Sequence, residues 1–216
     1  MIYLYSGTPG SGKSLDLARM VASNNIHTPF IINFEMKVKH MDNIYVILDW
    51  DKVNPVDLID FSDKYFKTHH FHEGAIKVII DECQIYFNAR EWNKGNRMEW
   101  LKFFSNHRHF GYDIYLCCQF DRMIDRQVRS MIEFEFLHRK VNNLGWRGVF
   151  LRCLTLSPTL FMVNRFYYPM KLPQGTHIFK YHRRYARCYD SYARAFVVGG
   201  GGSPRQILAL DQNNEQ

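Results

Sequence analysis

The residues best suited to chemistry lie near the start of the chain, in the run Gly7-Thr8-Pro9-Gly10-Ser11-Gly12-Lys13-Ser14. The run has a glycine, four further residues and then Gly-Lys-Ser, which is the phosphate-binding loop pattern. Glycines let such a loop wrap so that backbone N–H groups face phosphate oxygens at the positive end of the next helix. We expect Lys13 to reach the β- and γ-phosphates of a nucleotide and the Ser14 hydroxyl to ligate Mg²⁺.

A pair of acids follows the apolar run Val78-Ile79-Ile80. An acid at the carboxyl end of a buried strand beside the loop orients Mg²⁺, and this is the role expected for Asp81. Glu82 is placed to polarise a water aimed at the γ-phosphate. Two acids in tandem favour hydrolysis over transfer to a small acceptor, because such a kinase has to keep water away. The alternative interpretation is a solvated pair at the end of a strand.

Gln119 ends another buried strand and is the next polar candidate. Its amide could touch the γ-phosphate or the attacking water, or it could simply end the strand with its amide satisfied by the backbone. Proteins that prefer GTP usually read the base with an Asn-Lys-x-Asp motif. Asn93-Lys94-Gly95-Asn96 lacks the final acid, so ATP is the expected nucleotide.

Arginines outside these motifs fall into two groups. Arg108 precedes the strand that ends at Gln119, whereas Arg122, Arg126 and Arg129 lie at i, i+4 and i+7 on a helix expected over residues 121–131. An arginine row could project into the nucleotide site of a neighbouring subunit and stabilise transition-state charge, with Arg126 and Arg129 as the catalytic candidates. The alternative is a basic face that is solvated or binds DNA.

The composition of the chain is that of a globular protein. Of 216 residues, 46% are hydrophobic and 23% are charged, which excludes disorder over most of the chain. The 28 Lys and Arg against 21 Asp and Glu give a net charge of +7. This excess suits an anionic partner such as nucleotide, nucleic acid or lipid headgroup without choosing among them.

Cysteines and histidines give no sign of a metal site. The 5 cysteines form no CxxC pair, and we expect buried free thiols in a reducing compartment. His69, His70 and His72 lack carboxylate or cysteine neighbours at ligand spacing, so a polar helix end is expected.

Membrane spans and signal peptides are not predicted either. The longest apolar stretch, Val149 to Val163, is interrupted by Arg152 and by Ser157-Pro158. A span needs about 20 mostly apolar residues. The N-terminus lacks the basic region and apolar core of a signal peptide, and we therefore expect a cytosolic, soluble domain.

The elements that must position the candidate residues alternate along the chain. Apolar runs predict strands, and amphipathic stretches between them predict helices. Strands are expected over residues 2–5, 30–34, 44–48, 77–82 and 112–119, and helices over 14–22, 55–66, 96–107 and 121–131. Near-continuous Val, Ile and Leu in the strands indicates a parallel sheet covered on both faces. The expected fold is therefore α/β, a P-loop NTPase with a mostly parallel central sheet flanked by helices.

The pattern changes after about residue 132. Strands are expected over residues 133–141, 146–156 and 160–168, which predicts a small β-rich C-terminal extension. The expected division is a P-loop ATPase core over residues 1–140, a β-rich extension with a basic aromatic segment over 141–198, and a flexible Gly-rich tail over 199–216.

The basic aromatic segment covers residues 181–196. At about 100° per residue, its aromatic side chains fall within an arc of roughly 80° and its arginines on the opposite side. The two groups are Tyr181, Tyr185, Tyr189, Tyr192 and Phe196 against Arg183, Arg187 and Arg194. As a helix, the segment would pack its aromatic stripe on the domain and present arginines to phospholipid or DNA phosphates. The alternative is a solvated basic face.

Taken together, these motifs resemble the N-terminal domain of the zonular occludens toxin family, the filamentous-phage assembly ATPases. The shared blocks are the loop that opens at Gly7 and the Val78-to-Glu82 run. More particular are the block from His107 to Leu116 that leads into Gln119, and Tyr189-Asp190-Ser191-Tyr192. The resemblance covers roughly residues 1–196.

The resemblance implies a P-loop ATPase, using ATP and Mg²⁺, that drives extrusion of single-stranded DNA phage across the host inner membrane. Its implied partners are further copies of itself, other phage assembly proteins, and single-stranded DNA or its phage complex. The implied location is the host cytoplasm, at the cytoplasmic face of the inner membrane. Members are typically anchored by a membrane span after this domain, and this sequence contains no such stretch. The toxin activity that names the family belongs to its far C-terminal part and is not expected here.

The expected function is therefore an ATP-hydrolysing assembly motor that works as a ring or other homo-oligomer. One alternative is a DNA-translocating or packaging ATPase that grips the strand itself. Another is a nucleotide-gated scaffold that binds ATP with little turnover.

Overall fold

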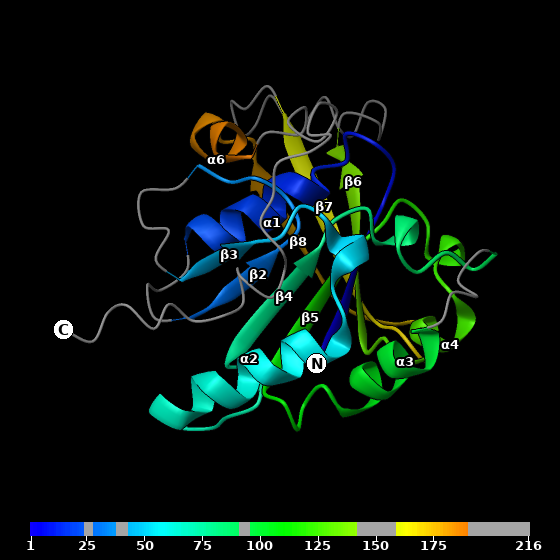
Figure 1. The fold of residues 1–216 in the computed structure, drawn as a ribbon. Helices are drawn as coiled ribbons and strands as arrows, with labels where there is room; N and C mark the ends of the chain where they lie inside the picture. Colours follow the sequence, from blue (N-terminus) through cyan, green and yellow to red (C-terminus); the bar gives the residue numbers. More distant parts are fainter. Residues whose placement is uncertain (24–27, 38–42, 91–95, 142–158, 190–216) are drawn as a thin grey trace.

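The computed structural model describes residues 1–23, 28–37, 43–90, 96–141 and 159–189, and their strands form one eight-stranded sheet in the order β3-β2-β4-β5-β1-β6-β7-β8 (Figure 1). The strands are β1 (Ile2–Ser6), β2 (Phe30–Ile32), β3 (Ile44–Val46), β4 (Ile76–Ile80), β5 (Tyr112–Cys117), β6 (Phe134–Lys140), β7 (Leu160–Tyr167) and β8 (Leu172–Lys180). The helices are α1 (Lys13–Ala22), α2 (Pro55–Thr68), α3 (Arg97–Asn106), α4 (Arg126–Ser130) and α6 (Arg183–Cys188). The described residues also form 3-10 turns at Trp50–Lys52, Cys83–Ile85 and Asp121–Met123.

The sheet is parallel from β3 to β6 and antiparallel beyond. β1 pairs in parallel with both β5 and β6, and β4 pairs in parallel with β5 on its other side. β7 and β8 are added antiparallel to β6. Because parallel strands end at the same edge, the segments that follow β1, β4 and β5 come together there. The predicted α/β fold with a mostly parallel sheet is confirmed.

Helices cover both faces of the parallel part of the sheet. Val78 and Ile79 are neighbours on β4 and therefore point to opposite faces. Val78 belongs to the core cluster that contains Phe61 of α2 and Trp100 of α3. Ile79 belongs to the cluster that contains Leu17 of α1. Burial on both faces is the reason that these strands read as continuous apolar runs in the sequence.

The start of α2 is where the sequence places it. Asn54 precedes the helix and Pro55 is its first residue, where a missing N–H costs no hydrogen bond. The backbone N–H of Asn54 donates to the Asp57 carboxylate at 3.0 Å, which completes a capping box.

The helix predicted over residues 121–131 is wrong in its extent. Asp121–Met123 is a separate 3-10 turn, and α4 begins only at residue 126. Asp125 precedes α4 with a non-helical φ of −50° and ψ of 141°, and its carboxylate caps the helix by accepting a backbone N–H at 2.8 Å. The three arginines therefore do not form a row on one helix face: Arg122, Arg126 and Arg129.

The helix predicted over residues 181–196 is also shorter in the described part of the chain. It covers Arg183–Cys188, and Tyr189 is extended with φ −109° and ψ 118°. Arg183 and Arg187 are exposed, as expected, while Arg194 lies outside the described residues.

The C-terminal strands continue the main sheet. The strand predicted over residues 160–168 is confirmed as β7, whereas the one predicted over 146–156 lies outside the described residues. The β8 strand is absent from the sequence prediction. The division into core, extension and tail stays a prediction, and β6 joins the two strand groups through its pairing with β1 and β7.

Cysteines in the described residues are free thiols, and three of them are buried: Cys83, Cys117 and Cys118. Burial raises the pKa of the Cys83 and Cys117 thiols. The expected buried free thiols are found at these three positions, Cys188 is free but partly exposed, and Cys153 lies outside the described residues. Across the described ranges, the helices are too short or too polar to cross a bilayer.

Candidate functional site

The loop predicted to bind phosphate lies between β1 and α1, at the carboxyl edge of the sheet. Gly7 and Gly12 adopt positive φ values of 139° and 98°. A Cβ on Gly7 would collide with the backbone carbonyl of His138, and one on Gly12 would lie 2.6 Å from the Phe161 ring. Both positions therefore require glycine for conformation and for space.

Lys13 is folded back into the loop that precedes it. Its ammonium donates to the carbonyl of Gly7 at 2.6 Å and to that of Thr8 at 3.3 Å, and the residue is only 7% exposed. The buried Ser11 hydroxyl has no hydrogen-bond partner in the described part of the chain. A buried hydroxyl without a partner is costly, and an incoming phosphate would supply an acceptor for it.

Ser14 and Asp81 are brought together at this edge. The Ser14 hydroxyl lies 3.3 Å from Asp81 Oδ2, and Asp81 is 2% exposed. Asn33, just after β2, clamps the backbone of Asp81: its Oδ1 accepts the Asp81 N–H at 2.7 Å and its Nδ2 donates to the Asp81 carbonyl at 3.0 Å. The sequence analysis missed Asn33, although a single amide inside the apolar run 30–34 was a usable signal.

Glu82 has a backbone conformation that is unusual for a residue with a side chain. Its φ is 50°, in the left-handed region, where strain is commonly stored at functional sites. The side-chain amide of Gln84 donates to the Glu82 carboxylate, and the Glu82 N–H donates to Asp81 Oδ1 at 2.9 Å. Gln84, which the sequence analysis also missed, thus fixes the direction of the Glu82 carboxylate.

Gln119 lies beside the loop, as its place after β5 predicts. Its carbonyl accepts the Gly7 N–H at 3.2 Å, which ties the end of β5 to the start of the loop. The structure therefore brings the loop, Asp81, Glu82 and Gln119 to one edge of the sheet.

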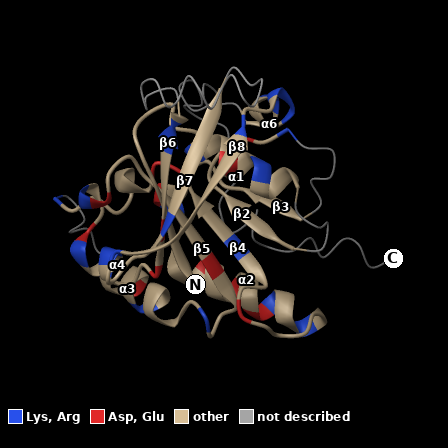
Figure 2. Cartoon of the chain, turned by 180° about the vertical axis from the view of Figure 1, so that it is seen from behind, with Lys and Arg blue, Asp and Glu red and all other residues tan. Residues whose placement is uncertain are grey.

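The arginine candidates lie elsewhere. Arg126 and Arg129 belong to α4, which packs with α3 on the face of the sheet opposite α1 (Figure 1). Arg129 reaches the Asp121 carbonyl at 3.5 Å, and Arg108 forms an ion pair with Glu133 at 2.6 Å. Seen from behind, Lys and Arg positions lie on α6 near α1 and again around α3 and α4 (Figure 2).

A pocket of about 360 Å³ lies over the loop. One wall is made by the loop and the first turn of α1, from Gly10 to Leu15. The opposite wall comes from the C-terminal part of the chain: Phe161, Tyr181, Ala186 and Tyr189. The Tyr189 hydroxyl donates to Asp81 Oδ2 at 2.6 Å. Mixed polar and aromatic walls suit a nucleotide, which has both phosphates and a flat base.

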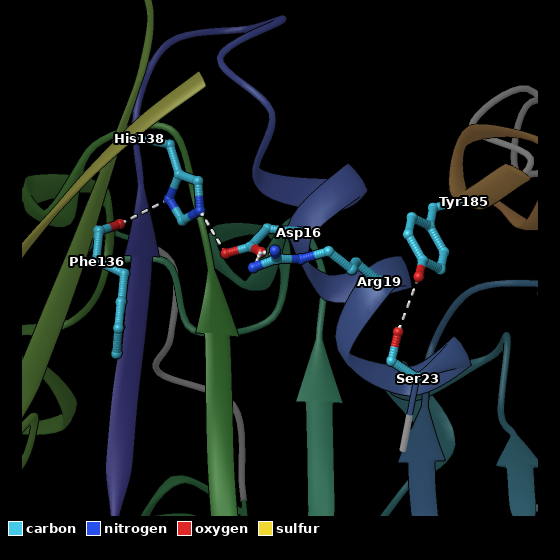
Figure 3. Close-up of polar contacts among 6 residues, drawn as sticks. All are labelled: Asp16, Arg19, Ser23, Phe136, His138 and Tyr185. Carbon is cyan, nitrogen blue, oxygen red and sulfur yellow. Dashed lines mark hydrogen bonds and ion pairs between the residues drawn. The ribbon is translucent and has the colours of Figure 1, made fainter. Parts of the chain in front are cut away.

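Behind the loop, α1 is fixed to β6 by a buried contact between Asp16 and His138 (Figure 3). Asp16 lies 3.1 Å from His138 Nε2 and 2.8 Å from the Arg19 guanidinium. His138 Nδ1 lies 2.8 Å from the Phe136 carbonyl, which fixes the ring. Burial raises the pKa of the Asp16 carboxyl, but His138 and Arg19 outweigh it, and the pKa lies below its ordinary value.

Comparison with known proteins agrees with this architecture. The chain matches the family Zonular occludens toxin (Zot) over residues 1–192. The gene 1 protein of Enterobacteria phage fd is 27% identical over 146 residues, which are 61% of this chain and 39% of that protein. The gene 1 protein of Salmonella phage IKe is 24% identical over 142 residues, 61% of this chain and 38% of that protein. The chain thus spans about two fifths of the length of these curated relatives.

Two solved structures share the fold. The N-terminal domain of zonular occludens toxin from Neisseria meningitidis superposes with a TM-score of 0.55 at 21% identity, covering 88% of this chain and 98% of that one. The DNA-packaging ATPase B204 from Sulfolobus Turreted Icosahedral Virus has a TM-score of 0.55 at 17% identity, covering 84% and 98%. The resemblance inferred from the motifs is confirmed: the chain belongs to the zonular occludens toxin family and is homologous to the gene 1 protein of filamentous phages.

Proposed function

We propose that this chain binds ATP with Mg²⁺ at the loop from Gly7 to Ser14 and hydrolyses it. The proposal rests on the 3.3 Å between the Ser14 hydroxyl and Asp81 Oδ2. Two neighbouring oxygen ligands of an octahedral Mg²⁺ at about 2.1 Å lie roughly 3 Å apart. A hydroxyl and a carboxylate at this spacing, next to a phosphate-binding loop, suit a Mg²⁺ ion that bridges nucleotide phosphates.

Each candidate residue has a role in the proposed reaction. Lys13 leaves the loop carbonyls to meet the β- and γ-phosphates, and the Ser11 hydroxyl gains a phosphate acceptor. Glu82, aimed by Gln84, takes a proton from the attacking water, and Gln119 contacts the γ-phosphate or that water. Bound Mg²⁺ would supply charge neutralisation as phosphate charge builds up on the leaving group.

The work that we propose for this hydrolysis is assembly and extrusion of a filamentous phage across the host inner membrane. Membership of the family and homology to phage gene 1 proteins support this role. We place the chain in the host cytoplasm, at the inner membrane, as a homo-oligomer with other phage assembly proteins. Arg126 or Arg129 would then act in a neighbouring subunit, because α4 lies on the face of the sheet opposite α1.

A DNA-translocating or packaging ATPase is the second candidate. Its support is the net charge of +7 together with the fold shared with a DNA-packaging ATPase. A motor that grips DNA should be stimulated by it, whereas an assembly motor that acts through protein partners should not. A scaffold that only binds ATP would show affinity without turnover.

The test is steady-state ATP hydrolysis measured against protein concentration, with and without single-stranded DNA. We expect Mg²⁺-dependent turnover whose specific rate rises with concentration as oligomers form. Lys13→Ala should lower turnover at least about 100-fold with the fold intact, because phosphate charge loses its ammonium partner. Turnover of this variant within a few-fold of the parent would contradict the proposal.

Mixing two inactive variants tests the arginines. Lys13→Ala chains and chains that lack the acting arginine, Arg126→Ala or Arg129→Ala, are each expected to be inactive, but a mixed oligomer contains intact loops beside intact arginines. Recovery of turnover on mixing would support action in trans, and the same experiment with Arg129→Ala would tell which arginine acts. No recovery with either variant would leave the arginines as a basic face.

A further inference from the structure

The segment of residues 181–189, here called the strap, closes over the nucleotide pocket from the C-terminal side. It runs from the end of β8 through α6, which lies beside α1 (Figure 1). The Ser23 hydroxyl at the end of α1 donates to the Tyr185 hydroxyl at 3.2 Å (Figure 3). The Lys37 N–H donates to the Cys188 carbonyl at 2.9 Å. The strap is therefore held on α1 and on the segment that follows β2.

Tyr189 is the strap residue that enters the site. Its backbone pairs with Met36, and its ring meets Phe34 edge-on at 5.1 Å between ring centroids. These contacts direct the hydroxyl to Asp81 Oδ2, at 2.6 Å. The same oxygen faces the Ser14 hydroxyl, while Oδ1 accepts the Glu82 N–H.

The number of hydrogen bonds that Asp81 Oδ2 can accept decides whether a metal-bound water can also donate to it. A carboxylate oxygen accepts about two hydrogen bonds, and Ser14 and Tyr189 already supply two donors to Oδ2. Mg²⁺ usually keeps several of its waters when it binds to a protein. A metal-bound water that donates to Asp81 Oδ2 therefore needs the position that the Tyr189 hydroxyl holds.

We propose that the Tyr189 hydroxyl takes the place of a Mg²⁺-bound water on Asp81, so that strap docking and binding of Mg²⁺-nucleotide exclude each other. The inference rests on the proposed function of the loop. Tyr189 then belongs to the metal site and responds to whether Mg²⁺-nucleotide is bound there. Through Tyr189, binding at that site affects docking of the strap, which follows β8. Because linkage is reciprocal, a bound nucleotide weakens strap docking by the same factor as docking weakens nucleotide binding.

The test compares Tyr189→Phe with Tyr185→Phe. The first removes the hydroxyl on Asp81 and keeps the ring on Phe34; the second removes a strap hydroxyl that bonds only to Ser23 among the described contacts. Affinity for a non-hydrolysable ATP analogue is measured by calorimetry with Mg²⁺ and with EDTA. We expect Tyr189→Phe to bind the Mg²⁺ complex about tenfold more tightly, since a hydrogen bond to a charged group no longer competes. Binding in EDTA should change less than about twofold, and Tyr185→Phe, which loosens the strap only through an exposed hydrogen bond between neutral groups, should tighten Mg²⁺-dependent binding much less than Tyr189→Phe.

Hydrogen exchange of the α6 amides gives a readout that does not depend on affinity. In the parent chain, the Mg²⁺-analogue complex should speed exchange over residues 183–188. In Tyr189→Phe, exchange should be fast already and unaffected by the analogue. Two results would overturn this inference and leave the proposed function standing. One is weaker Mg²⁺-dependent binding by Tyr189→Phe, and the other is hydrogen exchange in the parent chain that does not change when the analogue binds. A parent chain that binds no nucleotide would instead overturn the proposed function, and this inference with it.

Discussion

Two buried aspartates near the loop, Asp16 and Asp81, have hydrogen-bond and ion-pair partners of different kinds. They are 5% and 2% exposed. The groups found on Asp16 are an imidazole and a guanidinium, which are or can become cations. Those on Asp81 include two hydroxyls and a backbone N–H, all of them neutral. Burial alone therefore does not separate these two acids, whereas the charge of the partners named here does.

The difference follows from what each carboxylate must do. Asp16 fixes α1 to β6, so its charge is best compensated permanently within the fold. Asp81 is proposed to face a metal that comes and goes, and neutral donors can be exchanged for metal-bound water without leaving a buried cation behind. Substitutions at or beside the two acids should accordingly affect different observables.

The largest effect is expected beside Asp81, on turnover. Glu82→Gln keeps the shape of the side chain but removes the base, so turnover should fall about 10²- to 10⁴-fold while ATP still binds. Asp81→Asn should instead weaken Mg²⁺-dependent binding and leave Mg²⁺-free binding nearly unchanged. Single-turnover kinetics and calorimetry of the two variants separate the roles. Equal residual turnover with equal affinities would contradict the assignment.

Next in size is the effect of Asp16→Asn on stability. The substitution leaves the buried His138 ring and the Arg19 guanidinium without their carboxylate. Loss of one partner from a buried ion pair costs about 3 kcal/mol, a value at the low end because Arg19 is partly exposed. Urea unfolding should show this loss for Asp16→Asn and a smaller one for Asp81→Asn, because the donors named on Asp81 are neutral. Equal losses for both variants would remove the proposed difference between the acids.

Much of this site could be predicted from local sequence patterns. The glycines of the loop, the lysine and the acids follow one another along the chain, and apolar runs on both sides mark strands buried on both faces. The parts that could not be predicted depend on distant contacts. Tyr189 and Asp81 are 108 residues apart, and although Tyr189 opens the block Tyr189-Asp190-Ser191-Tyr192 that carries part of the family resemblance, nothing in that block indicates a contact with Asp81.

Elsewhere, local patterns were misleading for identifiable reasons. β8 is exposed along most of its length and contains Pro173-Gln174-Gly175, so it lacks the apolar alternation of a strand and is recognised only through its pairing with β7. Asp125 favours a helix cap over a helix interior, because its side chain competes for backbone N–H groups. The prediction of one long helix over residues 121–131 ignored this preference.

A smaller effect is expected at Gln84, which aims the Glu82 carboxylate. Gln84→Ala removes the amide that donates to Glu82. Removing a partner that orients a functional group typically lowers activity about 10- to 100-fold. For Gln84→Ala we expect roughly tenfold slower turnover with unchanged ATP affinity. Gln127→Ala, which loses a contact with Arg97 instead, is the matched control. A change in affinity without a change in kcat would show that Gln84 does not act through the proposed base.

The smallest effect concerns how the unfolding free energy falls at low pH, and it involves Asp16. Because the pKa of this carboxyl in the folded chain lies below 3.8, the unfolded chain takes up the proton first as pH falls. The stabilisation from the ionised carboxylate is complete above about pH 3.8 and is lost as pH falls through the folded value. The unfolding free energies of the parent chain and of Asp16→Asn should therefore converge below pH 3.8. Asp49→Asn, which breaks an exposed pair with Lys52, should follow the parent at every pH. Curves of the parent and of Asp16→Asn that stay parallel into acid would mean that the ionised carboxylate is not what fixes α1 to β6.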